Sequence, residues 1–149
     1  MLIAAAGATA QSMTAGSIAA EIGSEGARPV VQRLWNSGEF GRVLDAIATG
    51  DSEWIALSPE LASGADGAAG EGLGIALARA LPKNPAAVLS ALDAELPAIS
   101  IARVCGLPFV EGSIQDIESY RREAEAALEQ VRGAALQDRK ADCLADLRR

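Results

Sequence analysis

The sequence of 149 residues contains no histidine. That absence removes Ser-His-Asp and Cys-His catalysis and every metal site that depends on imidazole ligands. The only lysines are Lys83 and Lys140, and neither lies in the S-x-x-K spacing by which a lysine activates a serine nucleophile. The D-x-[DN]-x-[DN]-G run of a calcium loop is also missing. We therefore expect no catalytic residue, no cofactor and no metal site, and a protein that is not an enzyme.

Aromatic residues make up only 3% of the chain, although half of its residues are hydrophobic. A composition rich in alanine and poor in aromatics suits close-packed helices better than a β-sandwich. Basic residues are also few, because 13 Lys and Arg face 20 Asp and Glu, for a formal net charge of −7. Nucleic-acid backbones and anionic membrane surfaces are bound largely through Lys and Arg. We expect neither as a partner.

No membrane span is expected, since the apolar run at residues 2–10, LIAAAGATA, is too short to cross a bilayer. The run is typical of the second half of a signal peptide, with Ala8-Thr9-Ala10 in the A-x-A position before a cut at Gln11. The basic n-region is missing. We expect residues 1–10 to be a signal-peptide remnant and the protein to be periplasmic or secreted. The alternative is a mobile or helical N-terminus on a cytoplasmic protein.

Two apolar helices joined by a tight turn, at residues 72–92, organise the chain. Pro82 ends the first helix, Asn84 is a good N-cap, and Pro85 suits the first position of the second helix. The first helix carries one apolar stripe at helical spacing, made of Leu73, Ala76, Leu77, Ala80 and Leu81. Both apolar faces need neighbours, and the rest of the chain supplies them.

Further helices are predicted upstream, ending at Gly23, Gly38 and Gly50. We expect Asp51 and Ser58 to be N-caps of the helices that follow them. The glycine-rich residues 63–72 are either a flexible loop or a helix that begins at Asp66. A weak repeat aligns residues 43–47 with residues 88–92, a spacing in the range of HEAT and armadillo repeats. The predicted fold is all-α, with stacked helical hairpins in a short HEAT-like, α-solenoid-like bundle.

Composition changes at Ser113, where the chain becomes dense in charges of both signs. Ser113 and Asp116 form a capping pattern, and Gly133 separates two narrow apolar stripes. We expect one domain over residues 11–149, with apolar core helices at 11–112 and a charged helical hairpin at 113–149. Pairs such as Glu118–Arg122 are expected on its solvated face. A dimerisation seam is the alternative use of its narrow stripe.

The chain has two cysteines, Cys105 and Cys143. An even count in an exported chain favours a structural disulfide, which would stabilise a loop of that length by about 3–4 kcal/mol. Two buried free thiols are the alternative. No C-x-x-C redox motif is present.

Two tryptophans, Trp35 and Trp54, are the candidate interaction residues. Both lie in apolar stripes, which favours core positions, but an exposed tryptophan would be a binding hot spot. The preferred hypothesis is an exported helical module that binds another protein, with a protein of the cell envelope as the expected partner, as an inhibitor, an immunity-type protein or an adaptor. The alternative is a small-molecule-binding or catalytic domain with a pocket between hairpins. Exposed tryptophan on a flat acidic patch favours the first hypothesis, and a ligand-sized cavity lined by Arg33, Arg79 or Arg103 favours the second.

Three blocks within residues 28–111 carry a resemblance: RPVVQRLWNSGEFGRVLDAIATGDSEWIALSPELASGAD, GIALARALPKNPAAVLSAL and VCGLPFVE. They resemble a group of small uncharacterised exported proteins of Gram-negative bacteria. The resemblance implies a periplasmic helical domain with a Cys105–Cys143 bridge. It implies no activity and assigns no functional residue.

Overall fold

The computed structural model describes residues 12–109, 114 and 116–149, and over those residues its regular structure is helical throughout. The all-α expectation is confirmed. The elements are, in chain order, α1 (Ala15–Glu25), α2 (Ala27–Ser37), α3 (Phe40–Ala48), α4 (Ser52–Ala56), α5 (Ser58–Gly64), α6 (Gly67–Ala80), α7 (Pro85–Ala91), the 3₁₀ turn η1 (Pro97–Ile99), α8 (Ile101–Cys105), α9 (Ile117–Glu129), the 3₁₀ turn η2 (Ala134–Leu136) and α10 (Gln137–Leu147).

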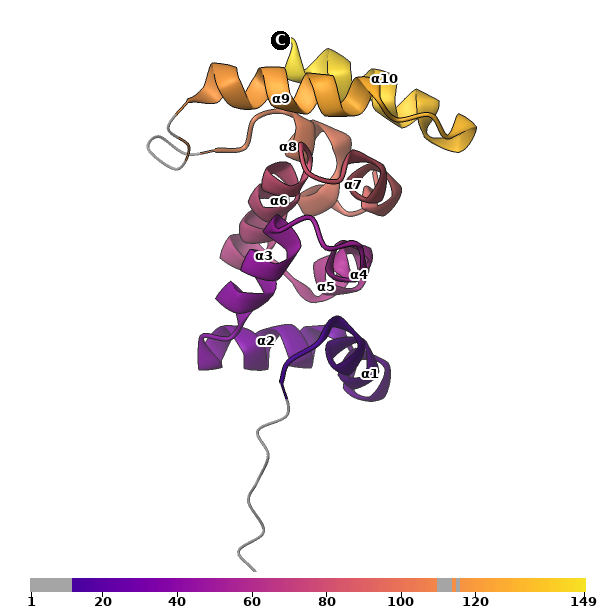
Figure 1. Cartoon of the computed structure of the whole chain (residues 1–149). Coiled ribbons are helices and arrows are strands. Elements are labelled where there is room, and N and C mark those ends of the chain that lie inside the picture. The colour runs from indigo at the N-terminus through magenta and orange to yellow at the C-terminus, as the bar shows by residue number, and fades with distance from the viewer. Residues whose placement is uncertain (1–11, 110–113, 115) are drawn as a thin grey trace, which may run out of the picture.

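The helices lie in layers along one axis (Figure 1). Helices α1 and α2 form one end, α9 and α10 form the other, and α3 to α8 lie between them. Among the described helices, none has both the length and the apolar character needed to cross a bilayer. The stacking of hairpins into a solenoid, and the division of the chain near residue 113, stay predictions.

Local capping explains where several helices begin. The Asp51 carboxylate accepts hydrogen bonds from the backbone N–H groups of Glu53 and Trp54, and Asn84 accepts one from Ala87. Asp116 caps α9, while its expected companion Ser113 lies outside the described residues. These side chains satisfy N–H groups that the first helical turn leaves without intrahelical acceptors.

Two predicted boundaries are wrong. Helix α1 continues through Gly23 and ends at Gly26, whose φ of 90° favours glycine and whose N–H donates to the Ile22 carbonyl. Ser58 is not an N-cap, because α4 runs almost directly into α5 through Leu57, which has helical backbone angles. The Ser58 side chain is instead fully buried, and its hydroxyl has no hydrogen-bond partner.

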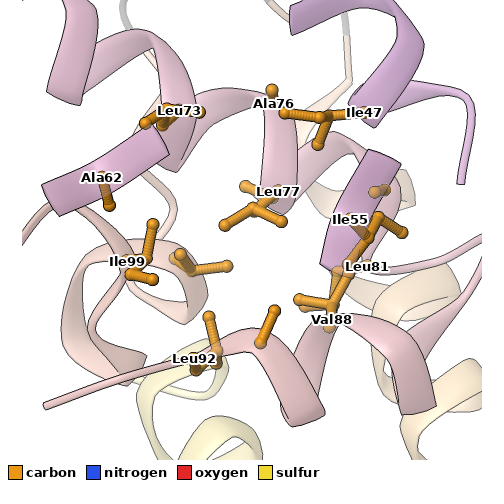
Figure 2. Packing of buried hydrophobic residues seen from close by; sticks show 14 of the residues in the cluster. Ile47, Ile55, Ala62, Leu73, Ala76, Leu77, Leu81, Val88, Leu92 and Ile99 are labelled. Atoms are coloured by element: carbon orange, nitrogen blue, oxygen red, sulfur yellow. The ribbon is translucent and has the colours of Figure 1, made fainter. Parts of the chain in front are cut away.

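Helix α6 is the centre of the core, as the apolar stripe predicted. It packs against α3 on one side and against η1 and α8 on another. Figure 2 shows Leu77 surrounded by buried side chains of other elements, among them Ile47, Ile55 and Ile99. Most of the glycine-rich residues 63–72 are helical, because α6 already begins at Gly67. This agrees with the alternative of a helix that begins at Asp66.

Glycines let the helices approach closely. A Cβ atom on Gly72 would lie 2.7 Å from the Leu44 side chain, and one on Gly74 would lie 2.9 Å from the Ala98 carbonyl oxygen. The contact at Gly74 is with backbone and excludes a larger residue there, whereas at Gly72 the end of the Leu44 side chain would have to shift. Small residues on α6 thus let η1 and α3 pack directly against it.

Helices α9 and α10 form the expected antiparallel hairpin, which lies across one end of the molecule (Figure 1). Arg148 joins its two helices through Glu125 and Glu129, at 3.6 Å and 3.3 Å. The predicted Glu118–Arg122 pair is wrong, because Glu118 pairs with Arg121 instead, at 3.5 Å.

The hairpin is fastened to the core in three ways. A disulfide joins Cys105 in α8 to Cys143 in α10. The Tyr120 hydroxyl donates a hydrogen bond to the Ala78 carbonyl in α6, and the Arg139 guanidinium donates one of 2.6 Å to the Leu89 carbonyl near the end of α7. The Tyr120 ring also meets Phe109 edge to face, with centroids 4.8 Å apart.

Because Tyr120 is buried, we expect the free energy of unfolding to fall at alkaline pH. Burial raises the pKa of its phenol above the usual 10, so that above pH 10 the unfolded chain ionises while the folded chain does not. Its contribution to the free energy of unfolding is complete below pH 10 and falls by about 1.4 kcal/mol per pH unit above it. Denaturant titrations at pH 9–12 followed by circular dichroism measure this slope, and because Tyr120 is the only tyrosine, the phenolate absorbance of the wild type reports its ionisation alone. The control Tyr120→Phe should lose the slope, and an unchanged slope would contradict the assignment.

Candidate interaction surface at Trp35

Trp35, in α2, is 49% exposed, and it is the one large hydrophobic residue classed as exposed in the described part of the chain. The expectation that it is a core residue is wrong, because α2 buries Val30, Val31 and Leu34 and leaves Trp35 at the edge of that face. Its ring lies against Phe40, with centroids 6.0 Å apart and planes tilted by 55°. Phe40 is buried and therefore holds one side of the indole in place.

Trp54 is different. It is partly buried and packs against the hydrophobic core, which is the core position that its apolar stripe favoured. We assign it no part in the surface described here. The structure thus separates the two tryptophans, which the sequence presented as equivalent candidates.

Trp35 forms one wall of a groove of about 310 Å³ between α2 and the connection from α5 to α6. Arg28 and Gln32, which precede it on α2, continue that wall. The residues that contribute from the other side are small or short, and include Gly64, Asp66 and Ala68. The groove is partly open to solvent.

The groove depends on Gly64. A Cβ atom there would lie 2.4 Å from the carbonyl carbon of Ala27 and 2.6 Å from the amide nitrogen of Arg28. The end of α5 therefore touches the backbone of α2 where α2 begins. No local sequence pattern predicts this contact, because it joins residues far apart in the chain.

One end of the groove holds a positive and a negative side chain, Arg28 and Asp66. The Arg28 guanidinium lies 3.8 Å from the Asp66 carboxylate, and their side chains are 72% and 86% exposed. Such a long, solvated pair contributes little to stability. Asp66 occupies the cap position of α6 but makes no cap hydrogen bond with its side chain, so both side chains remain at the surface.

Arg33 also lies on α2, but its guanidinium is paired with two glutamates of α1. It donates hydrogen bonds of 2.7 Å to Glu25 and to Glu21 of α1. The hydrogen bond with Glu25, more than any other contact, raises the pKa of the guanidinium above its usual value. Arg33 thus attaches α1 to α2.

The three arginines proposed as markers of a ligand cavity do not converge. Arg33, Arg79 and Arg103 line three separate depressions, of about 410, 200 and 340 Å³ respectively. In the part of the chain that the structure describes, no group of three or more His, Cys, Asp or Glu side chains is placed to hold a metal ion.

Both cysteines are fully buried and form the Cys105–Cys143 disulfide, so the alternative of two free thiols is wrong. The bridge joins α8 to α10, whereas the groove is lined by Trp35 and other residues of α2. Helices α2 and α10 lie at opposite ends of the layered structure (Figure 1). The disulfide is therefore a structural element and not part of the groove.

Comparisons with models of protein families, with curated proteins and with solved structures find no match. The interpretation of the surface rests on its own residues.

Proposed function

We propose that this protein is an exported helical module that binds another protein through the groove at Trp35. The observation that carries the proposal is the half-exposed indole, fixed on one side by Phe40 and bordering an open groove. Tryptophan is enriched among the few residues that dominate binding energy at protein interfaces. Because Phe40 already restrains the ring, a partner covers it at little cost in side-chain entropy. An inhibitor, an immunity-type protein or an envelope adaptor fits this description.

Export is part of the proposal. Disulfides persist in oxidising compartments and are rare in the cytosol, so the Cys105–Cys143 bridge supports a periplasmic or secreted location. The A-x-A pattern at residues 8–10 supports the same location. The partner is then another protein of the cell envelope or outside it.

A small-molecule site remains the second candidate, favoured by the depression of about 340 Å³ at Arg103. Glu71 and Leu96 also line it, so charged and apolar groups meet there. A compound that raises the melting temperature of the wild type but not of Arg103→Ala would support this candidate over the first.

A photo-cross-linking experiment tests the protein-binding function. A benzophenone amino acid replaces Gln32, an exposed residue that lines the groove beside Trp35, in the chain expressed in its source cells, and the matched control carries it at Arg122, an exposed residue of α9. We expect a covalent adduct from position 32 and none from position 122. The captured protein, identified by mass spectrometry and purified, should bind Trp35→Ala at least about 30-fold more weakly than the wild type. Equal adducts at both positions, or none at either, would refute the proposal.

A further inference from the structure

We infer that the protein seated in the Trp35 groove is a second copy of this chain, related by a two-fold axis that brings two α2 helices together antiparallel. The inference rests on the proposed function, since it takes the groove as a docking surface and names its occupant. A two-fold contact uses the same patch on both copies, so that each pairwise contact occurs twice.

The spacing of two groove residues supports this arrangement. Arg28 and Trp35 both line the groove and are seven residues apart on α2, which places them about two turns and about 10 Å apart on one side of the helix. When two such helices run antiparallel about an axis beside Gln32, the indole of each copy lies opposite the Arg28 of the other. The patch is therefore complementary to itself.

The chemistry of that contact is favourable. Tryptophan is the best ring for a cation–π pair, and arginine is the more frequent cation in such pairs. Arg28 is free to adopt this position, because its side chain is 72% exposed and its contact with Asp66 is long, at 3.8 Å. The opposite wall and floor of the groove, with Gly64, Ala68 and Ala69, leave a volume of about 310 Å³, which accommodates an indole.

The charge at the groove argues against a strongly charged peptide as its occupant. The exposed groove end holds one cation and one anion, Arg28 and Asp66, and so selects neither a basic nor an acidic peptide. The chain as a whole carries a formal charge of −7, and two copies repel each other at long range. We therefore expect a weak dimer that becomes more stable as salt screens this repulsion.

Sedimentation equilibrium of the full chain, from about 1 μM to about 1 mM, is the first test. The apparent mass should rise towards that of a dimer, and Trp35→Ala should raise the dissociation constant at least about 30-fold. Arg28→Ala should raise it roughly 5-fold through loss of the cation–π pair. The control Arg42→Ala removes the same charge from α3, outside the groove, and should have no effect beyond slightly altered repulsion.

A second variant tests the geometry. Because both native cysteines are in the disulfide, Gln32→Cys adds the only free thiol of each chain. A short bis-maleimide linker should join two copies at this position, and adding Trp35→Ala should abolish the product. A wild type that stays monomeric at the highest concentration would overturn the inference, as would an Arg28→Ala variant that associates as strongly as the wild type. A monomeric wild type whose chain still cross-links from position 32 to a different protein refutes only the second copy, whereas no adduct of any kind refutes the proposed function as well.

Discussion

The double variant Cys105→Ala/Cys143→Ala is expected to unfold with a free energy about 4 kcal/mol lower than the wild type, and with a melting temperature roughly 10 °C lower. The bridge closes a loop of 38 residues between α8 and α10. Breaking that loop increases the entropy of the unfolded chain, which is the main source of the expected loss. Denaturant titration followed by circular dichroism measures the change.

The loss of local stability should be greatest in the hairpin formed by α9 and α10. Without the bridge, α9 and α10 stay on the core through apolar packing and through three described hydrogen bonds, from Tyr120 to Ala78 and from Arg139 to Leu89 and Ser90. Amide exchange in residues 116–149 should therefore accelerate more than exchange in α6. Wild type reduced in denaturant and refolded in excess dithiol is the control, and it should match the double variant. A loss of less than about 1 kcal/mol would contradict the view that the bridge, rather than packing alone, fastens the hairpin.

Gly64→Ala is expected to lower the free energy of unfolding by about 3 kcal/mol. The added Cβ atom would lie 2.4 Å from the backbone of Ala27, and backbone atoms cannot rotate away as a side-chain tip can. Helix α2 must move away from α5, which also deforms the groove at Trp35. The variant should therefore lose binding at that groove together with stability.

Gly41→Ala is the matched control for this substitution. Gly41 lies inside α3, and a Cβ atom there meets nothing within 4 Å. Alanine is the better helix former, so this variant should be more stable than the wild type by up to about 1 kcal/mol. Urea titrations measure the free energy of unfolding of both variants. The comparison separates the effect of the steric contact at residue 64 from the effect of replacing glycine by alanine in a helix. A Gly64→Ala variant as stable as the wild type would show that α2 and α5 do not touch as described.

Local signals predicted much of the fold. Asp51 and Asn84 cap helices because a cap requires only the residue and the next two or three amide groups. The stripe at residues 73–81 predicted a central helix, since a face that is apolar over several turns must be covered.

The candidate surface could not be predicted in the same way. Val31, Leu34 and Trp35 occupy one broad arc of α2, and which of them is covered depends on where α5 and α6 meet that helix. The contact between Gly64 and Ala27 joins residues 37 positions apart, and no local pattern marks it. The expectation that Ser58 is a cap fails for a similar reason. Its sequence neighbours indicate the start of a helix, but tertiary packing, which no local pattern shows, buries its side chain.

The claim that this is an exported, disulfide-linked module is tested most directly by the intact mass of the chain taken from the periplasmic fraction of its source cells. The mass is measured before and after reduction and alkylation. We expect a chain that begins at Gln11 and is two hydrogens lighter until it is reduced. A chain that retains residues 1–10 and carries two free thiols would contradict both the export and the bridge.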